Sequence, residues 1–238
     1  MKSSREPASG FTLVEVIVLL LVIAIAAVAL APSVLKLSAT QKSNNTYDEM
    51  EYLHQCIMGS PKEGAFGYVG DMGRLPSSLA DLVEPGALPL HNTRGAGSVG
   101  MGWNGPYCPT KSKYDVTTDA WGNEYAYGRK GLGQIQSAGP DGQFDTQDDI
   151  IYPPNPTPYF GDVRIELIPS GDYAVRLYYT DNGVEKFLQA DKQPFLFKNI
   201  HYGPHAVQVF HKDGDNLRLA RETLIVLTSR SGVFMIDF

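Results

Sequence analysis

The segment that most constrains this 238-residue chain is the apolar stretch from residue 11 to residue 31. Within it only Thr12 and Glu15 are polar, and neither glycine nor proline interrupts it. As an α-helix the segment would be about 30 Å long, which matches the hydrocarbon core of a bilayer. A carboxylate inside a bilayer costs roughly 2.5–3.5 kcal/mol, and such groups are usually paired and functional. We therefore expect a transmembrane helix over residues 11–31 whose Glu15 needs a partner.

Residues 1–10 precede this segment, and the last of them is the small residue Gly10. In an ordinary secretory signal the small-residue cleavage site follows the apolar stretch, so that cleavage removes the stretch. Here the order is reversed, and cleavage after Gly10 would leave the helix on the mature chain. Cleavage would also create an α-amine at Phe11, four residues before Glu15, and this amine is a candidate partner for the carboxylate.

The sequence from Gly10 to Glu15, followed by an unbroken apolar stretch, resembles the class III signal of type IV pilins and type II secretion pseudopilins. The resemblance implies that a prepilin peptidase cuts after Gly10 and methylates the new N-terminus at Phe11. It also implies that Glu15 meets the N-terminal amine of a neighbouring subunit during filament assembly. A plain signal anchor with an incidental glutamate is the competing interpretation.

The helical pattern continues beyond Pro32 as far as Gly59, with Met50, Leu53 and Ile57 recurring among charged and polar residues. A proline inside a helix removes one backbone hydrogen bond and costs about 3 kcal/mol. Because the pattern resumes, we expect Pro32 to kink one long assembly helix rather than to end it. A helix terminus at the membrane surface is the alternative.

Four carboxylates crowd into nine residues: Asp141, Asp145, Asp148 and Asp149. They would repel one another unless a cation neutralises them. Hard oxygen ligands on a flexible loop suit Ca²⁺, which takes six to eight oxygens and accepts backbone carbonyls. The spacing is not that of an EF-hand, and a solvated acidic turn is the alternative.

The blocks that precede this loop, at residues 105–107, 119–123 and 125–127, resemble the C-terminal sheet of major pseudopilins. Major pseudopilins carry a structural calcium loop at this place. The resemblance maps calcium ligands onto Asp141, Asp145 and Asp148, with Asp149 as a further candidate.

Prolines 153, 154, 156 and 158 predict an extended, semi-rigid linker. Beyond it, short β-rich stretches alternate with turns, which predicts a small β-sandwich. The expected strands are 163–168, 173–180, 184–189, 195–200, 206–211, 223–228 and 233–237. The pattern is similar to prealbumin-like or carboxypeptidase-regulatory-like sandwiches, and standard major pseudopilins lack such a domain.

Charge and motif content argue against several other functions. The net charge of −6 gives no basic surface for nucleic acid. The G-x-G-x-x-G pattern at residues 95–100 lacks the following helix that a dinucleotide site requires. No histidine lies in a metalloprotease motif, and His201 and His205 are weak metal candidates, so we expect no enzyme. Cys56 and Cys108 are either a disulfide or a free or merely buried pair, and the sequence leaves both open.

Together these features predict an α+β fold, in which a long N-terminal transmembrane and amphipathic helix packs on a small antiparallel sheet with a calcium loop, followed by an all-β sandwich. The expected segments are a leader (1–10), a transmembrane assembly helix (11–31), a pseudopilin-like body (32–151), a linker (152–159) and the sandwich (160–238).

The expected function is that of a type II secretion pseudopilin, anchored once in the inner membrane with its globular domains in the periplasm. Its expected partners are copies of itself, other pseudopilins, a prepilin peptidase and the inner-membrane assembly platform. The alternatives are a minor type IV pilin with an adhesive β-domain and a signal-anchored periplasmic binding protein.

Overall fold

A computed structural model describes residues 12–108, 117–214 and 216–237, with the backbone alone for residues 29–35 and 98. The chain divides into two compact units, Met1–Asn44 and Asn45–Phe238. The predicted processing site, Gly10 and Phe11, lies outside the described residues. The predicted transmembrane segment also reaches residue 11 and the side chains of residues 29–31, which are outside this set.

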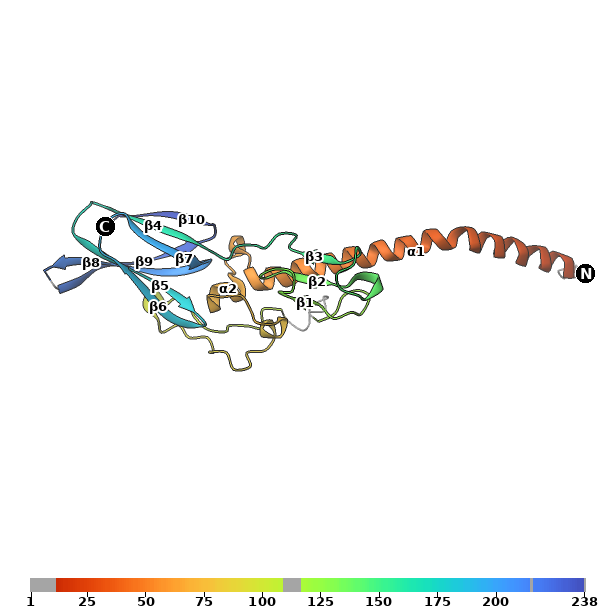
Figure 1. The fold of residues 1–238 in the computed structure, drawn as a ribbon, viewed down its shortest axis with the longest axis horizontal. Helices are drawn as coiled ribbons and strands as arrows, with labels where there is room; N and C mark the ends of the chain where they lie inside the picture. Colours follow the sequence, from red (N-terminus) through yellow and green to blue (C-terminus); the bar gives the residue numbers. More distant parts are fainter. Residues whose placement is uncertain (1–11, 109–116, 215, 238) are drawn as a thin grey trace, which may run out of the picture. The chain divides into compact units, whose positions relative to one another are not determined.

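The first element is the helix α1, Leu13–Met58, which includes position 32 (Figure 1). The helix therefore does not end at Pro32. It ends before Gly59, whose φ of 79° is left-handed, as is usual for a glycine that follows a helix. Among the residues that the structure describes, no helix is both long enough and apolar enough to cross a membrane.

The end of α1 belongs to the second unit and supplies one side of the body's core. Met50, Leu53 and Ile57 are fully buried there, as their spacing predicts, and each contributes about 1.5–3 kcal/mol by leaving water. They pack with aromatic and apolar side chains that include Tyr68 and Ile135. The body also contains the short helices η1 (Pro61–Glu63), α2 (Gly67–Met72), η2 (Leu79–Leu82), η3 (Ala96–Ser98) and η4 (Gly139–Asp141). Its antiparallel sheet has the order β1-β2-β3, formed by Ala126–Tyr127, Ile135–Ser137 and Ile150–Tyr152.

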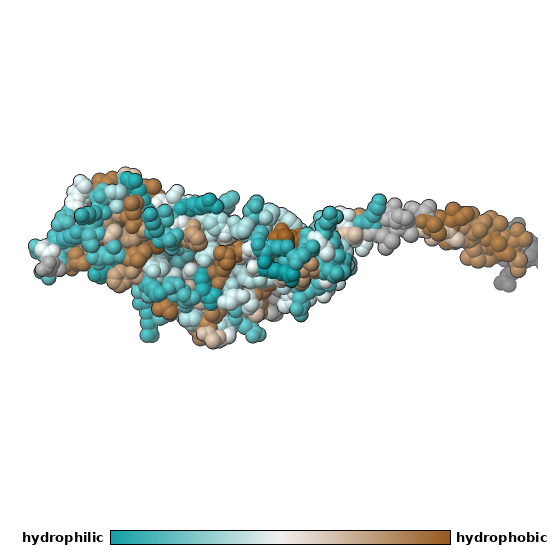
Figure 2. Space-filling model, viewed as in Figure 1, coloured by the Kyte–Doolittle hydropathy of each residue, from teal (hydrophilic) through white to brown (hydrophobic). Residues whose placement is uncertain are grey.

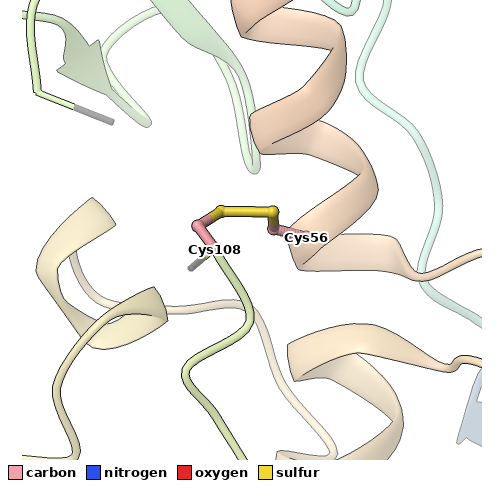
Figure 3. Close-up of a disulfide and its surroundings, with 2 residues drawn as sticks. All are labelled: Cys56 and Cys108. Atoms are coloured by element: carbon pink, nitrogen blue, oxygen red, sulfur yellow. A yellow bond between two sulfur atoms is a disulfide. The ribbon is translucent and has the colours of Figure 1, made fainter. Parts of the chain in front are cut away.

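A disulfide joins Cys56, near the end of α1, to Cys108 (Figure 3). The two Cα atoms are 5.8 Å apart, within the usual range for a disulfide. Both residues belong to the buried core of the body. The structure thus decides between the two states that the sequence leaves open.

The C-terminal strands form two sheets that enclose one apolar core. One sheet has the order β10-β4-β7 and the other β6-β5-β8-β9. The seven strands are β4 (Phe160–Ile168), β5 (Tyr173–Asp181), β6 (Val184–Ala190), β7 (Phe195–His201), β8 (Gly203–Asp213), β9 (Asn216–Leu227) and β10 (Ser231–Asp237). All pairs are antiparallel except β10 with β4, which is parallel. Alternate residues of both sheets, such as Val163, Leu177 and Val209, share the core, so the predicted α+β class and β-sandwich are confirmed.

The body contacts the sandwich through α2, which lies against β5 and β8. The N–H of Gly183, in the turn after β5, donates to the carbonyl oxygen of Met72 at 3.0 Å. Gly73 has a left-handed φ of 73°, and a Cβ at this position would clash with the carbonyl oxygen of Thr180. The two parts therefore meet in a close backbone contact that requires glycine. Of the predicted linker 152–159, Tyr152 is the last residue of β3, and residues 153–159 connect β3 to β4.

Candidate functional site

Glu15, the carboxylate inside the apolar stretch, finds a partner within its own chain. The Thr12 N–H donates to Glu15 Oε2 at 3.4 Å, and the Glu15 N–H donates to Thr12 Oγ1 at 3.3 Å. This reciprocal pair is a capping box, which satisfies two N–H groups at the start of α1. The sequence pattern T-x-x-E before an apolar helix is the signal that could have revealed it.

The first turns of α1 expose an apolar surface (Figure 2). Its large side chains between residues 13 and 28 are all exposed, from 43% at Val16 to 77% at Leu13. A contiguous apolar surface of this kind marks a site that meets another apolar surface or a membrane. The arrangement is therefore suited to assembly rather than to chemistry.

The second candidate site is the acidic loop, which we define as residues 139–149, between β2 and β3. It begins with η4, and Gly142 follows that helix with a left-handed φ of 68°. Asp145 is also left-handed, at φ 75°, a conformation that aspartate tolerates better than most residues. Gly139 has little space, because a Cβ there would clash with the backbone of Asp148. The backbone thus folds the loop tightly upon itself.

Asp148 and Asp149 accept hydrogen bonds from other residues of the loop. Asp148 Oδ2 accepts from the Asp141 N–H at 3.1 Å, and Asp149 Oδ2 accepts from the Asp145 N–H at 2.7 Å. Asp148 Oδ1 and Asp149 Oδ1 both lie near Thr146 Oγ1, at 2.7 and 3.4 Å. The Thr146 hydroxyl bond is the leading cause of a lowered pKa at Asp148. Two carboxylates therefore converge on one hydroxyl.

Asp145 points to basic side chains instead. Its carboxylate forms ion pairs with Lys130 and, at 2.7 Å, with Arg129. Hydrogen bonds from Lys130 and then Arg129 hold the pKa of Asp145 below its usual range. Sequence reasoning missed these two cations, although they stand only a short distance before the loop.

Within the described part of the chain, no three acidic, histidine or cysteine side chains come together in an arrangement that could hold a metal ion. The structure brings Asp148 and Asp149 together and leaves Asp141 and Asp145 directed elsewhere. The oxygen donors have the chemistry that Ca²⁺ prefers, but this arrangement does not form a complete shell. Calcium binding by these residues stays a prediction.

Asp119 is a buried positioning residue whose role was not predicted from the sequence. Its Oδ1 accepts from the N–H groups of Trp121 and Asn123, at 2.9 and 2.8 Å, and its Oδ2 accepts from Ser137 Oγ. Asn123 Nδ2 then donates to the carbonyl oxygen of Gly139 at 2.8 Å. The turn at residues 119–123 is thereby fastened to the start of the acidic loop.

Two further sequence candidates have structural roles. A Cβ at Gly95 would clash with Glu185, and one at Gly97 would lie 2.8 Å from Ala206 Cβ. Gly95 and Gly97 therefore permit a close approach of this loop to the sandwich. His201 and His205 are buried, with their ring centroids 4.7 Å apart.

A long helix that packs against a small antiparallel sheet is the architecture expected of a pilin-like subunit. Residues 63–152 match a protein-family model, that of protein G of the type II secretion system (T2SS). This match covers α2, the three-stranded sheet and the acidic loop, and it confirms the predicted pseudopilin resemblance over these residues. Strands β4–β10 are consistent with an added β-domain. No curated protein and no solved structure gives a significant match.

The family of the matched region has a structural role and not an enzymatic one. Its role in type II secretion implies association with the cell envelope and assembly with other pseudopilins.

Proposed function

We propose that this chain is a pseudopilin of a type II secretion system, with no enzymatic role. Its helix α1 anchors it once in the inner membrane, and its body and sandwich lie in the periplasm. Copies of the chain and other pseudopilins assemble through α1 into a short filament that supports protein export. The assembly platform in the inner membrane builds this filament after a prepilin peptidase removes residues 1–10 and methylates Phe11.

The observation that carries this proposal is the match of residues 63–152 to protein G of the type II secretion system. The exposed apolar side chains of residues 13–28 support it, because neighbouring helices or lipid would cover them. Glu15 also supports it. Its hydrogen bond from the Thr12 N–H is long, at 3.4 Å, so a neighbouring ammonium group would compete well for the carboxylate.

Processing is tested by the mass of the chain recovered from membranes of cells that carry the secretion machinery. We expect the mass of residues 11–238 plus one methyl group. The variant Gly10→Ala should keep its leader and fail to support export, whereas the neighbouring Ser9→Ala should behave as the natural chain does. An unchanged mass and unchanged export for Gly10→Ala would refute the proposal and favour a plain signal anchor.

We also propose that the acidic loop binds one structural Ca²⁺ through Asp141, Asp145, Asp148 and Asp149. The convergence of Asp148 and Asp149 on Thr146 supports this, since two carboxylates close together attract a cation. Binding would require Asp145 to leave Arg129 and Lys130. At calcium one hundred times above Kd, the free energy of unfolding should rise by about 2.7 kcal/mol.

The calcium proposal is tested by thermal unfolding in excess Ca²⁺ and in EGTA. The natural chain should melt at a higher temperature in Ca²⁺, and Asp148→Asn should lose most of this difference. Asp172→Asn, a substitution in the sandwich, should retain it. An equal melting temperature in both solutions, together with no calcium by elemental analysis, would rule the site out.

A further inference from the structure

The outer face of the sheet β6-β5-β8-β9 carries an ordered row of planar polar side chains. Strand pairing places Gln189, Arg176, Gln208 and Glu222 side by side across the four strands. Each of them is exposed or half-buried, so the row is open to solvent. We define these four residues as the polar row.

Arg176, at the centre of the polar row, is held in one orientation. Its Cζ lies 5.1 Å from the ring centroid of Phe187 and 4.8 Å from that of Phe210. Its Nε donates to Gln189 Oε1 at 2.9 Å, which fixes the plane of the guanidinium. The two rings and the hydrogen bond already restrict the rotamers of Arg176. The side chain therefore loses less conformational entropy on binding a ligand than a free arginine would.

The two terminal nitrogens of Arg176 form no ion pair or hydrogen bond with any residue that the structure describes. Glu222, which supplies the carboxylate of the row, accepts a hydrogen bond from Gln208 Nε2. Gln208 Oε1 accepts from the Tyr178 hydroxyl at 2.8 Å. The polar groups beside Arg176 are therefore hydrogen-bonded to one another, and the guanidinium fork keeps free N–H groups. A fork of this geometry matches a carboxylate with two parallel hydrogen bonds.

Two features beside the fork indicate what carries the carboxylate. Phe187 is 51% exposed and stands beside Tyr178, with 5.5 Å between the ring centroids. Such rings offer an apolar face of the kind on which the C–H face of a sugar can stack. Each glutamine amide uses one N–H and one oxygen lone pair on its neighbours, Gln189 Nε2 donating to Asp191 Oδ1 at 3.1 Å, and keeps a second N–H and a second lone pair for hydroxyl groups. The loop with η3 bounds this row, because the Ala96 N–H donates to Glu185 at 2.6 Å and Gly97 lies against Ala206.

We propose that the polar row is a binding site for a carboxylated saccharide of the uronic-acid type. Arg176 holds the carboxylate, Phe187 stacks on the ring, and Gln189, Gln208 and Glu222 meet its hydroxyl groups. The site is independent of the role of α1, so it stands or falls separately from the proposed function. It gives the sandwich a ligand at the cell envelope.

The test uses the full chain in a non-ionic detergent and isothermal titration calorimetry with galacturonic acid trisaccharide. We expect saturable binding that weakens as salt is raised. Galactose trisaccharide, which lacks the carboxylates, should not bind. An acidic peptide of glutamate and aspartate should bind more weakly than the acidic saccharide.

Arg176→Lys keeps the charge but loses the fork and the stacking, and should weaken binding on the order of tenfold or more. Phe187→Leu removes the ring proposed to stack on the sugar and one of the two rings that hold Arg176, and should also weaken binding. Arg164→Lys is the matched control on the other sheet, where Arg164 pairs with Glu166, and should bind as the natural chain does. Absence of binding, equal binding by Arg176→Lys, or tighter binding of the peptide would overturn the proposal.

Discussion

Acid should weaken the sandwich through a buried histidine. His205 Nε2 donates to the carbonyl oxygen of His201 at 2.8 Å, and its Nδ1 finds no hydrogen-bond partner among the described residues. The side chain is fully buried. Burial, with His201 acting in the same direction, lowers the pKa of His205 to about 3. An unfolded histidine titrates near 6.5, so His205 is neutral in the fold and takes up a proton on unfolding below that pH.

Proton linkage gives the sign and size of the change in the free energy of unfolding with pH. Because the folded pKa is lowered, the contribution of His205 is fully present above about pH 6.5 and falls as the pH decreases toward 3. Between pH 7 and pH 5 the loss is about 2 kcal/mol for this residue alone. His201 adds to it, because burial also lowers its pKa and its Nε2 accepts from the Thr180 N–H at 3.2 Å.

The assay is urea unfolding at pH 7, 6 and 5 for the natural chain and for His205→Gln, whose amide can donate the same bond but does not titrate. The variant should be less stable at pH 7, and the gap to the natural chain should shrink by about 2 kcal/mol at pH 5. His91→Gln changes an exposed histidine and should leave the pH dependence as it is. A gap between His205→Gln and the natural chain that stays constant from pH 7 to pH 5 would refute the reasoning.

Three further changes should affect stability in urea unfolding. Replacing Cys56 and Cys108 by serine opens a loop with a sequence separation of 52 residues and should lower the free energy of unfolding by about 4 kcal/mol; no loss would contradict the disulfide. Asp119→Asn should cost about 2 kcal/mol, because an amide cannot accept from all the donors that face it; a neutral result would exclude the positioning role. Gly73→Ala should cost about 2 kcal/mol or more through its left-handed φ and its contact with Thr180, and a variant as stable as the natural chain would contradict that contact.

Much of the sandwich could be predicted because alternation and turn residues are local signals. All seven strands lie where the sequence predicted them, and the main error is the start of β9, which begins at Asn216. Its first four residues alternate between polar and apolar, but Ala220, Arg221 and Glu222 break this alternation before Thr223, where the expected strand starts. The parallel pairing of β10 with β4 was beyond prediction, since partner choice depends on the whole fold.

The sites show the same division between local and distant information. The capping box of Glu15 is local and could have been predicted from T-x-x-E. The disulfide needed the distance between Cys56 and Cys108, which only the fold supplies. Arg129 and Lys130 reach Asp145 only because the chain folds back through β2. The number of carboxylates in the loop sequence therefore overstates their mutual repulsion, because Arg129 and Lys130 neutralise Asp145.

The central claim is that α1 assembles copies of this chain side by side, and site-directed crosslinking tests it most directly. Each chain would carry Val14→Cys and Leu21→Cys. Cys56 and Cys108 are already joined to each other, so they would not compete with the introduced cysteines for crosslinking. In cells with the secretion machinery, oxidation should give a ladder of crosslinked multimers, and Lys198→Cys in the sandwich should not give one. A chain that stays monomeric under these conditions would contradict assembly through the helix.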